Sequence, residues 1–488
     1  MTQPKPILRE PIDVQPATEI GPVHFIAIGG SGMNGIAKLY HELGVQTSGS
    51  DRQDSAALRA LEEQGVRVHV GHDPSQLQDA KTVVISSAVR ESNVELAEAR
   101  RRGLRVWHRS AALAALMVGK RGVAVAGTHG KTSTTALAAV MLREADQGAS
   151  YVIGGPLAQT GSSAELGAGE AFVVEADESD ASFLQYPTEI AVITNIGADH
   201  LVNWRTPEAY RDGFRRFATG PKVKHVVINV DDEGSRALAD ELDDEEIEVV
   251  RYGLEEDADV RITDVMPLPT GVSATISWGA DSGRIELKVP GTYNLVNAAA
   301  SYAVGRLLGL SHAEAVQALE QYEGALRRFQ LITDTAGIRV YDDYAHLPAE
   351  IRTALTAARA ATKAGNEATG RNGRLIGCFQ PHLYSRTVDF SDEFGEVMTL
   401  ADIAVINDVC GAREDPVPGV TGELVVEAAI RHGARDVRYV EDKYDLPAAL
   451  NEMSRPGDLI ITMGCGDVTI VGPLLAPLLA ERPEAAEN

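Results

Sequence analysis

The stretch that decides the fold is VAVAGTHGKTSTTAL, residues 123–137. An apolar run enters a loop bracketed by Gly127 and Gly130, and Lys131 and four hydroxyl-bearing residues lead into a helical pattern. A strand, a glycine loop and a helix in this order predict a phosphate-binding P-loop, whose backbone N–H groups and helix N-terminus face the anion. The usual spacing is G-x-x-x-x-G-K-[ST], and the first glycine comes late here. The alternative is a glycine turn with a Thr/Ser helix cap and an exposed Lys131.

Polar side chains that could hold a metal follow two further apolar runs. Glu175 ends the run in FVVEADESD, and Asp199 and His200 come just after the run in VITNIGADH. Lys131 can neutralise the charge of the β- and γ-phosphates, and the Thr132 hydroxyl can bind Mg²⁺. A carboxylate and an imidazole at the strand ends then suit a second divalent ion. Taken separately, Glu175 could cap a helix and His200 could be a surface histidine.

A second glycine loop lies near the start of the chain. HFIAIGGSGMNGIA contains Gly30-x-Gly32-x-x-Gly35, and Asp51 follows about 20 residues later. This pattern is typical of dinucleotide binding and would suit a nicotinamide-dependent oxidoreductase, but a UDP-sugar pyrophosphate fits the same backbone. Two adjacent phosphate loops favour an ATP-consuming enzyme that acts on a nucleotide-linked substrate. His72, Ser86 and Ser87 could contact the same ligand, or could be ordinary loop residues.

Composition excludes some classes of partner. The 488 residues include 70 acidic and 45 basic side chains, a formal net charge of −25, which disfavours nonspecific binding to nucleic acid or anionic membranes. No apolar stretch approaches the eighteen residues of a membrane span. The three cysteines lack paired spacing, which indicates a reducing cytoplasm. Residues 1–20 are expected to be a loosely ordered lead-in and not a signal peptide.

Three series of alternating strand and helix patterns predict an α/β protein of three domains, at residues 1–118, 119–325 and 326–488. The first series includes HFIAIG and TVVISSA, the second GVAVAG and KHVVINV, and the third IRVYDD and DLIITMG. The polar, glycine-bearing segment KAGNEATGRNG, residues 363–373, is expected to be a surface loop.

The motifs together resemble the Mur ligases, which add amino acids to the peptidoglycan precursor. The resemblance rests on AGTHGKTSTT, EADESD with TNIGADH, GTYNLVNAAA, GALRRFQ and YDDYAH, and it runs from about residue 22 to about residue 472. The short glycine spacing is that family's form of the P-loop. The resemblance implies a Rossmann-like UDP-binding domain, a central P-loop ATPase-type domain and a C-terminal Rossmann-like domain that binds the amino acid. DDYAHLPAEI and FQPHLYSRT further imply an ATP- and Mg²⁺-dependent joining of L-alanine to UDP-N-acetylmuramate through an acyl phosphate, by a monomer or homodimer.

The resemblance also implies roles for individual residues. The catalytic set is Lys131, Glu175, His200, Arg328, Asp343 and His346, with a metal-bound oxygen as the alternative to His346 for activating the amine. ATP contacts are implied for Gly127, Thr128, His129, Gly130, Lys131, Thr132, Ser133, Asn294, Asn297 and Arg328, and metal contacts for Thr132, Glu175 and His200. Substrate contacts are implied for Gly30, Ser31, Gly32, Asp51, His72, Ser86, Ser87, His382 and Arg386.

Four positions depart from the family's pattern: Ser163, Val202, Leu383 and Cys410. None of them is an implied metal or phosphate ligand. A ligase that attaches a recycled murein tripeptide to the same nucleotide sugar remains an alternative within the fold. An ATP-switched binding protein without catalysis is another.

Overall fold

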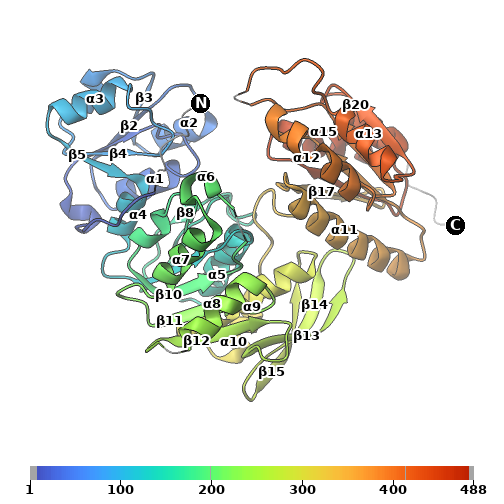
Figure 1. Ribbon diagram of the computed structural model, residues 1–488, viewed down its shortest axis with the longest axis horizontal. Coiled ribbons are helices and arrows are strands. Elements are labelled where there is room, and N and C mark those ends of the chain that lie inside the picture. Colours follow the sequence, from blue (N-terminus) through green and yellow to red (C-terminus); the bar gives the residue numbers. More distant parts are fainter. Residues whose placement is uncertain (1–7, 198, 244, 413, 483–488) are drawn as a thin grey trace. The chain divides into compact units, whose positions relative to one another are not determined.

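The computed structural model describes residues 8–197, 199–243, 245–412 and 414–482. Its strands form three sheets flanked by helices (Figure 1), so the predicted α/β class is confirmed. The chain divides into two compact units. The first comprises Met1–Thr263, Ile276–Gly283 and Val296–Gln321, and the second comprises Asp264–Thr275, Arg284–Leu295 and Tyr322–Asn488. No helix among the described residues is both long and apolar enough to cross a bilayer.

The first sheet is parallel throughout, in the order β3-β2-β1-β4-β5. Its strands are β1 (Val23–Ile26), β2 (Thr47–Asp51), β3 (Arg67–Val70), β4 (Thr82–Ile85) and β5 (Arg105–His108), and its helices are α1 (Asn34–Glu42), α2 (Ala56–Glu63), α3 (Val94–Arg101) and α4 (Arg109–Leu116). Strand order reverses direction beside β1, which places the first glycine loop where parallel α/β sheets bind ligands.

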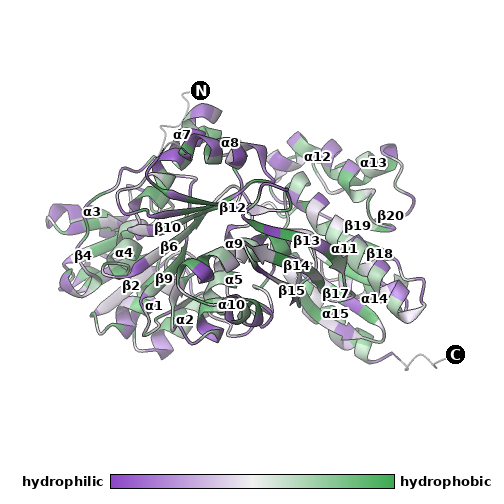
Figure 2. Cartoon of the chain, turned by 90° about the horizontal axis from the view of Figure 1, so that it is seen from below, coloured by the Kyte–Doolittle hydropathy of each residue, from purple (hydrophilic) through white to green (hydrophobic). Residues whose placement is uncertain are grey.

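The second sheet has the order β15-β14-β13-β12-β11-β10-β6-β9-β7-β8, and the boundary between the two units passes through β13–β15. Its strands are β6 (Arg121–Ala126), β7 (Ser150–Val152), β8 (Ala164–Glu165), β9 (Ala171–Glu175), β10 (Thr188–Ile193), β11 (His225–Asn229), β12 (Glu248–Gly253), β13 (Val260–Pro267), β14 (Val272–Trp278) and β15 (Asp281–Leu287). The helices are α5 (Lys131–Glu144), α6 (Leu201–Trp204), α7 (Pro207–Ala218), α8 (Glu233–Leu242), α9 (Thr292–Leu307) and α10 (His312–Leu319). Figure 2 shows the apolar central strands β6, β9 and β10, whose burial on both faces is typical of parallel sheets.

The third sheet lies entirely in the second unit, in the order β16-β17-β21-β18-β19-β20, and only β16 is antiparallel. Its strands are β16 (Gln330–Thr335), β17 (Ile338–Asp343), β18 (Leu375–Phe379), β19 (Ile403–Asn407), β20 (Val437–Val440) and β21 (Leu459–Met463). The helices are α11 (Pro348–Thr369), α12 (Tyr384–Met398), α13 (Glu423–Arg431), α14 (Leu446–Met453) and α15 (Val471–Ala480).

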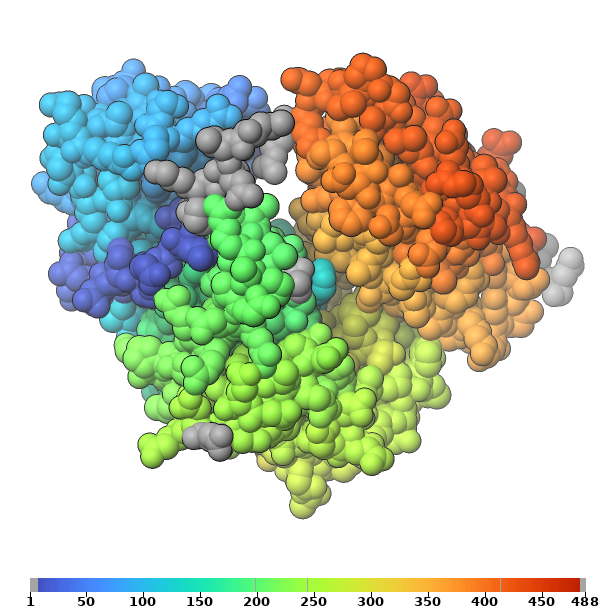
Figure 3. Space-filling model, viewed as in Figure 1, coloured from blue at the N-terminus to red at the C-terminus, as the bar shows by residue number. Residues whose placement is uncertain are grey.

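The expectation of a loosely ordered lead-in is wrong for residues 8–20, whereas residues 1–7 lie outside the described part. The Arg9 backbone N–H donates to the Asp180 carbonyl (2.9 Å), and Ile12 and Gln185 exchange two hydrogen bonds of 2.8 Å. Ala17 and Ile20 are buried in the core. In Figure 3 the dark blue beginning of the chain lies against green residues of the same unit. Long-range partners such as Gln185 leave no local pattern in the sequence.

The expected surface loop at residues 363–373 is also wrong for its first seven residues, because α11 continues through Thr369. Gly365, which suggested a break, is buried where a Cβ atom would come within 2.4 Å of Arg339 Nη2. The glycine therefore serves close packing inside the helix. The helix ends instead at Gly370, whose φ of +67° favours glycine.

Candidate active site

The loop between β6 and α5 has the backbone that its two glycines require. Gly127 has φ +146° and Gly130 has φ +83°, conformations that disfavour other residues. A Cβ atom on Gly127 would lie 1.9 Å from Thr194 Oγ1. Neighbouring groups hold the loop between them, because the His129 N–H donates to Asn195 Oδ1 (2.9 Å) and the Thr128 hydroxyl lies 3.1 Å from the Tyr210 hydroxyl. The predicted strand, loop and helix are therefore present.

Lys131 begins α5 and turns its ammonium group back over the loop. Nζ donates to the carbonyl oxygens of Gly127 (2.5 Å) and Thr128 (3.2 Å). It also contacts both carboxylate oxygens of Glu178, at 3.0 Å and 2.9 Å. Because Glu178 is 1% exposed, this carboxylate is buried and its negative charge is matched by the lysine.

Thr132 and Glu175 meet beside the same helix N-terminus. The Thr132 hydroxyl donates to Glu175 Oε1 (3.0 Å), and the Gly154 N–H donates to Glu175 Oε2 (2.7 Å). These contacts fix the carboxylate at the end of β9, as the sequence predicted. A hydroxyl and a carboxylate oxygen side by side suit Mg²⁺, which takes few protein ligands and completes its shell with phosphate oxygens and water.

His200 lies on the other side of Glu178. Its Nε2 is 3.5 Å from Glu178 Oε1 and 3.6 Å from Asp199 Oδ2. The nearby Glu178 carboxylate is the main cause that raises the pKa of His200 above its usual value, against the opposing effect of burial. Glu175, Thr132, Lys131, Glu178 and His200 thus form one continuous series of neighbours.

The fit to divalent cations is clearer at Thr132 and Glu175 than at His200. No three His, Cys, Asp or Glu side chains in the described ranges form a group able to hold a metal by themselves. Magnesium at nucleotide sites usually takes several of its ligands from phosphate oxygens and water. At His200 one neighbouring carboxylate, Glu178, is engaged by Lys131, and the other is Asp199, 3.6 Å from Nε2.

Two more of the expected ATP contacts lie at this loop. A Cβ atom on Gly130 would be 3.1 Å from Asn297 Oδ1, so Asn297 lies beside the loop. Ser133 is buried in the first turn of α5. Asn294 belongs to the second unit, where its side-chain amide donates to the Pro290 carbonyl (2.7 Å).

The first glycine loop follows β1, with Gly30 and Ser31 exposed. Asp51 holds the loop, because its Oδ2 accepts from the Gly29 N–H (2.9 Å). Arg109 Nη1 would lie 3.1 Å from a Cβ atom on Gly32. Arg109 also donates to Asp177 Oδ2 (2.8 Å), which places a guanidinium between this loop and the EADESD segment.

His72 belongs to a buried polar cluster of the first sheet. Its Nδ1 lies 2.9 Å from Ser50 Oγ and 3.3 Å from Glu95 Oε2, and Ser50 donates to the same Glu95 oxygen (2.5 Å). Desolvation by burial acts to raise the pKa of Glu95, but the hydrogen bond from Ser50 and the nearby His24 ring, whose Nε2 lies 3.7 Å from Oε2, lower it overall. His72 is therefore held in place by Glu95 and by Ser50, the residue that precedes Asp51.

Ser87 helps to join the first and second sheets. Its hydroxyl donates to Asp180 Oδ2 (2.9 Å) and lies 3.2 Å from His108 Nε2, while Arg9 Nε donates to Asp180 Oδ2 (3.2 Å). We call Arg9, Ser87, His108 and Asp180 the interdomain clasp. Burial lowers the pKa of His108 to about 3, so its imidazole is neutral here. Ser86 is half-buried just beyond β4.

The remaining expected residues lie in the second unit. Arg328 lies over the ring of Tyr344 (4.9 Å), and the same ring contacts the His346 ring edge-on. Asp343 is buried and accepts from the N–H groups of Phe329 (2.7 Å) and Ala345 (2.8 Å). Desolvation raises the pKa of Asp343 to about 6.

His382 and Arg386 flank the start of α12. His382 pairs with Cys410 in a parallel bridge, in which the Leu383 N–H donates to the Cys410 carbonyl (2.9 Å). Leu383 has φ +71°, a strained conformation for a non-glycine residue and one that often occurs at functional sites. Two of the four departures from the family pattern, Leu383 and Cys410, thus contact each other.

Three family models match successive parts of the chain. They are the Mur ligase family catalytic domain at residues 22–121, the Mur ligase middle domain at 125–305 and the Mur ligase glutamate ligase domain at 327–466. A UDP-N-acetylmuramate–L-alanine ligase of Cutibacterium acnes is 58% identical over 473 residues, 97% of this chain and 99% of the relative. The chain belongs to the Mur ligase family.

Other Mur ligases agree. A UDP-N-acetylmuramate–L-alanine ligase of Thermobifida fusca is 45% identical, over 96% of this chain and 98% of its own. The crystal structure of UDP-N-acetylmuramate-alanine ligase MurC from Thermotoga maritima matches with a TM-score of 0.78 and 26% identity, over 93% of this chain and 98% of that one. A murein peptide ligase from Psychrobacter arcticus matches with a TM-score of 0.64 and 23% identity, over 95% and 99%, and supports the fold alone.

The candidate site of this Mur ligase also contains acidic residues that the sequence did not predict to belong to it. Glu178 binds Lys131, Asp177 binds Arg109 and Asp180 completes the interdomain clasp. All three acids stand in the quoted EADESD segment, but the sequence pattern indicates only Glu175, which ends the apolar run. Beyond the strand the segment turns, so spacing alone does not indicate which acid faces the loop.

Proposed function

We propose that this Mur ligase joins L-alanine to the lactyl carboxylate of UDP-N-acetylmuramate, with ATP as the energy source. The observation that carries the proposal is 58% identity to a ligase of that name over nearly the full length of both chains. An intact phosphate loop beside Glu175 and Glu178 supports it. The proposed domains are 1–118 for the UDP substrate, 119–325 for ATP and 326–488 for the amino acid, in a cytoplasmic monomer or homodimer.

The chemistry follows from the weakness of a carboxylate as an electrophile. Transfer of the γ-phosphoryl group of ATP to the lactyl oxygen forms an acyl phosphate, the amine of L-alanine attacks its carbonyl carbon, and phosphate leaves. Carboxylate and triphosphate are both anions, so they approach each other only where positive charge is preorganised. Lys131 and the N-terminus of α5 supply such charge, and we assign Gly127, Thr128, His129, Gly130, Ser133, Asn294 and Asn297 to the nucleotide.

Thr132, Glu175 and His200 would hold magnesium in this proposal. Bound magnesium would neutralise phosphate charge during transfer. Glu178 is added as the residue that keeps Lys131 and His200 in position before ATP arrives, because its buried carboxylate contacts both. Arg328 and Asp343 are assigned to the ATP side from the third domain.

The amine must lose a proton when it attacks, and His346 suits this step. Its Nδ1 lies 3.1 Å from the Tyr344 carbonyl, which can only accept, so Nδ1 carries the hydrogen and Nε2 presents a lone pair. Glu350 Oε2, 3.2 Å from Nδ1, stabilises the charged ring that results. His382 and Arg386 are assigned to the peptide end of the substrate.

The assigned UDP-sugar contacts are Gly30, Ser31, Gly32, Asp51, His72, Ser86 and Ser87. Gly30 and Ser31 are exposed at the first loop, and Arg109 lies beside Gly32. A guanidinium near a glycine loop favours a pyrophosphate. We therefore add Arg109 to this set.

The deciding experiment measures ADP release with UDP-N-acetylmuramate and each of the twenty amino acids, and with the murein tripeptide L-alanyl-γ-D-glutamyl-meso-diaminopimelate. L-Alanine is expected to give the highest kcat/KM. A preference for the tripeptide would replace the proposal with the recycling ligase. If the chain binds NAD(P)H in the absence of ATP and releases no ADP, the oxidoreductase hypothesis would replace the proposed ligase.

A further inference from the structure

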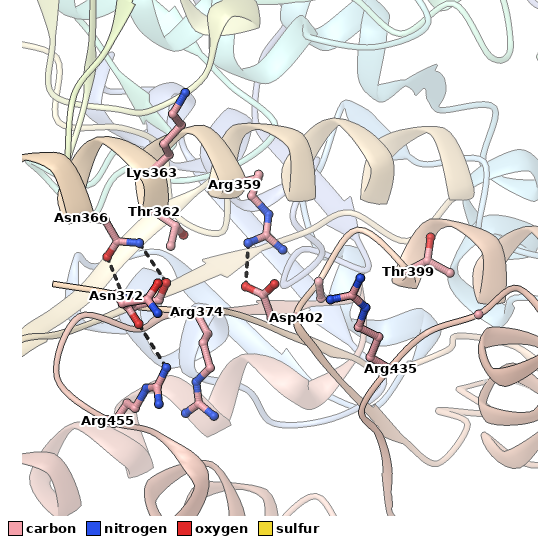
Figure 4. A pocket seen from close by; sticks show the side chains of 13 residues that line it. Arg359, Thr362, Lys363, Asn366, Asn372, Arg374, Thr399, Asp402, Arg435 and Arg455 are labelled. Atoms are coloured by element: carbon pink, nitrogen blue, oxygen red, sulfur yellow. Dashed lines mark hydrogen bonds and ion pairs between the residues drawn. The ribbon is translucent and has the colours of Figure 1, made fainter.

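A basic pocket of the second unit has no role in the proposed reaction. Five cationic side chains and one carboxylate line a hollow of about 730 Å³: Arg359, Lys363, Arg374, Arg435, Arg455 and Asp402 (Figure 4). We call it the arginine pocket. Its volume falls within the usual range for small-molecule sites. Such a concentration of cations stands out on a chain with a net charge of −25.

The arginine pocket lies at the opposite end of the third sheet from the expected amino-acid contacts. Arg374 directly precedes β18, Asp402 precedes β19 and Arg435 lies two residues before β20, so these side chains mark the amino ends of the strands. His382 and Cys410 follow the carboxyl ends of β18 and β19. Substrates of parallel α/β sheets bind at the carboxyl ends, so a ligand here would not be a reactant.

Internal ion pairs leave part of this positive charge uncompensated. Arg359 donates to Asp402 (2.6 Å), and Arg374 donates to the fully buried Asp458 (2.7 Å). Arg455 is 3.9 Å from Asp458, a carboxylate already bound by Arg374.

The other two cations of the arginine pocket are Lys363 and Arg435. Lys363 lies 3.8 Å from the exposed Glu367. Across the ranges that the structure describes, the Arg435 side chain makes no hydrogen bond or ion pair. The neighbouring acid, Asp436, is bound by Arg438 through two contacts of 3.0 and 3.1 Å.

We propose that the arginine pocket binds a small anion of the phosphate class with at least two charged groups. Guanidinium groups match phosphate oxygens through paired N–H donors. In Figure 4, Arg374 and Arg455 lie on one side of the Arg359–Asp402 pair and Arg435 lies on the other, an arrangement that suits two linked phosphates. The net negative charge of the chain opposes a long nucleic acid, which would extend beyond the pocket.

The ligand would also connect parts of the chain that are far apart in sequence. Lys363 comes from α11, whereas Arg374, Arg435 and Arg455 come from three different connections. Binding would therefore stabilise the connections at the amino ends of the strands of the third sheet. The proposal does not depend on the assigned reaction.

The test is isothermal titration of the full chain with inorganic pyrophosphate, using Arg435→Gln and, as the matched control, Arg431→Gln. Both arginines are exposed, but Arg431 lies outside the pocket and pairs with Asp392. Lys131→Ala removes a cation of the P-loop, so it distinguishes pyrophosphate bound at the P-loop from pyrophosphate bound in the arginine pocket. We expect one pyrophosphate site to survive Lys131→Ala and to weaken about tenfold in Arg435→Gln. Arg431→Gln should leave it unchanged, and ADP release without pyrophosphate should remain normal in Arg435→Gln.

Three results would overturn the proposal. The first is equal pyrophosphate affinity in Arg435→Gln and the unmodified chain. The second is an equal loss in Arg431→Gln, which would indicate general electrostatics. The third is tighter binding of citrate or of a single-stranded oligonucleotide than of pyrophosphate, which would change the ligand class.

Discussion

The ammonium group of Lys131 rests on the buried carboxylate of Glu178, with Nζ 2.9 Å from Oε2 and 3.0 Å from Oε1. The same carboxylate lies 3.5 Å from His200 Nε2. One acid therefore positions two of the residues proposed to meet the nucleotide and its metal. An arriving phosphate would compete with Glu178 for the lysine.

Lys131→Ala should lower kcat by about three orders of magnitude, because a preorganised charge at the transferring phosphate is lost. UDP-N-acetylmuramate binds elsewhere in the proposal, so its affinity should stay within about twofold. Phosphate release and isothermal titration measure the two effects. Lys120→Ala, which removes a lysine bound to the Gly169 carbonyl, is the matched control and should keep normal turnover. An active Lys131→Ala enzyme would refute the assignment of the loop.

Glu178→Gln should lower the pKa of His200 toward its usual value, because Glu178 is the main cause that raises it. A raised histidine pKa adds stability below the unfolded-state pKa of about 6.5, and this stability is lost as the pH rises through the folded-state value. NMR titration of the His200 imidazole measures the shift. Asp199→Asn, a weaker influence, should produce a smaller change, and the opposite ranking would contradict the series of contacts.

Gly154→Ala should raise the Mg²⁺ concentration needed for half-maximal ADP release about tenfold, as changes behind a metal ligand do. The new Cβ atom would come 2.6 Å from Glu175 Oε2 and displace the carboxylate from Thr132. Gly197→Ala is the control, since its Cβ atom would make only an ordinary contact of 3.7 Å with Thr128. If the magnesium dependence is unchanged in Gly154→Ala, Glu175 does not bind the ion.

His108→Gln should remove a pH dependence of stability. A histidine whose pKa is about 3 in the folded chain stays neutral, whereas the unfolded chain takes up a proton below about 6.5. Between pH 7.5 and pH 5 this group alone reduces the free energy of unfolding by about 2 kcal/mol. Denaturant unfolding at both pH values measures the loss, which His108→Gln should abolish. Ser110→Ala keeps the imidazole and should keep the slope; identical slopes in His108→Gln and the unmodified chain would count against a buried neutral histidine.

The sequence was sufficient to predict the structural features that depend on residues close together in the chain. The strand, the glycines at 127 and 130 and the helix from Lys131 follow from local sterics and hydrophobic pattern, and they appear where expected. The chain pattern also predicted the α/β class. It did not predict β2, TSGSD, because this strand is polar; its Thr47 and Ser50 are buried through hydrogen bonds to Val45 and Glu95.

The features that the sequence did not predict depend on tertiary contacts. Glu178, Asp177 and Asp180 leave β9 within a turn, and each meets a partner from a different element: Lys131, Arg109 and Ser87. Likewise, Gly365 stays helical because Arg339 packs on it, a residue 26 positions away along the chain. No local rule connects such pairs.

The interdomain clasp has a practical consequence for anyone who wishes to exchange parts between relatives. Arg9 precedes the first sheet, yet it is bonded to Asp180 beyond β9, and Ile12 is bonded to Gln185. A chimera cut just before β1 would thus join a borrowed leading segment to a foreign docking surface. Hybrid enzymes should be designed so that residues 8–12 and 177–185 are inherited from the same parent.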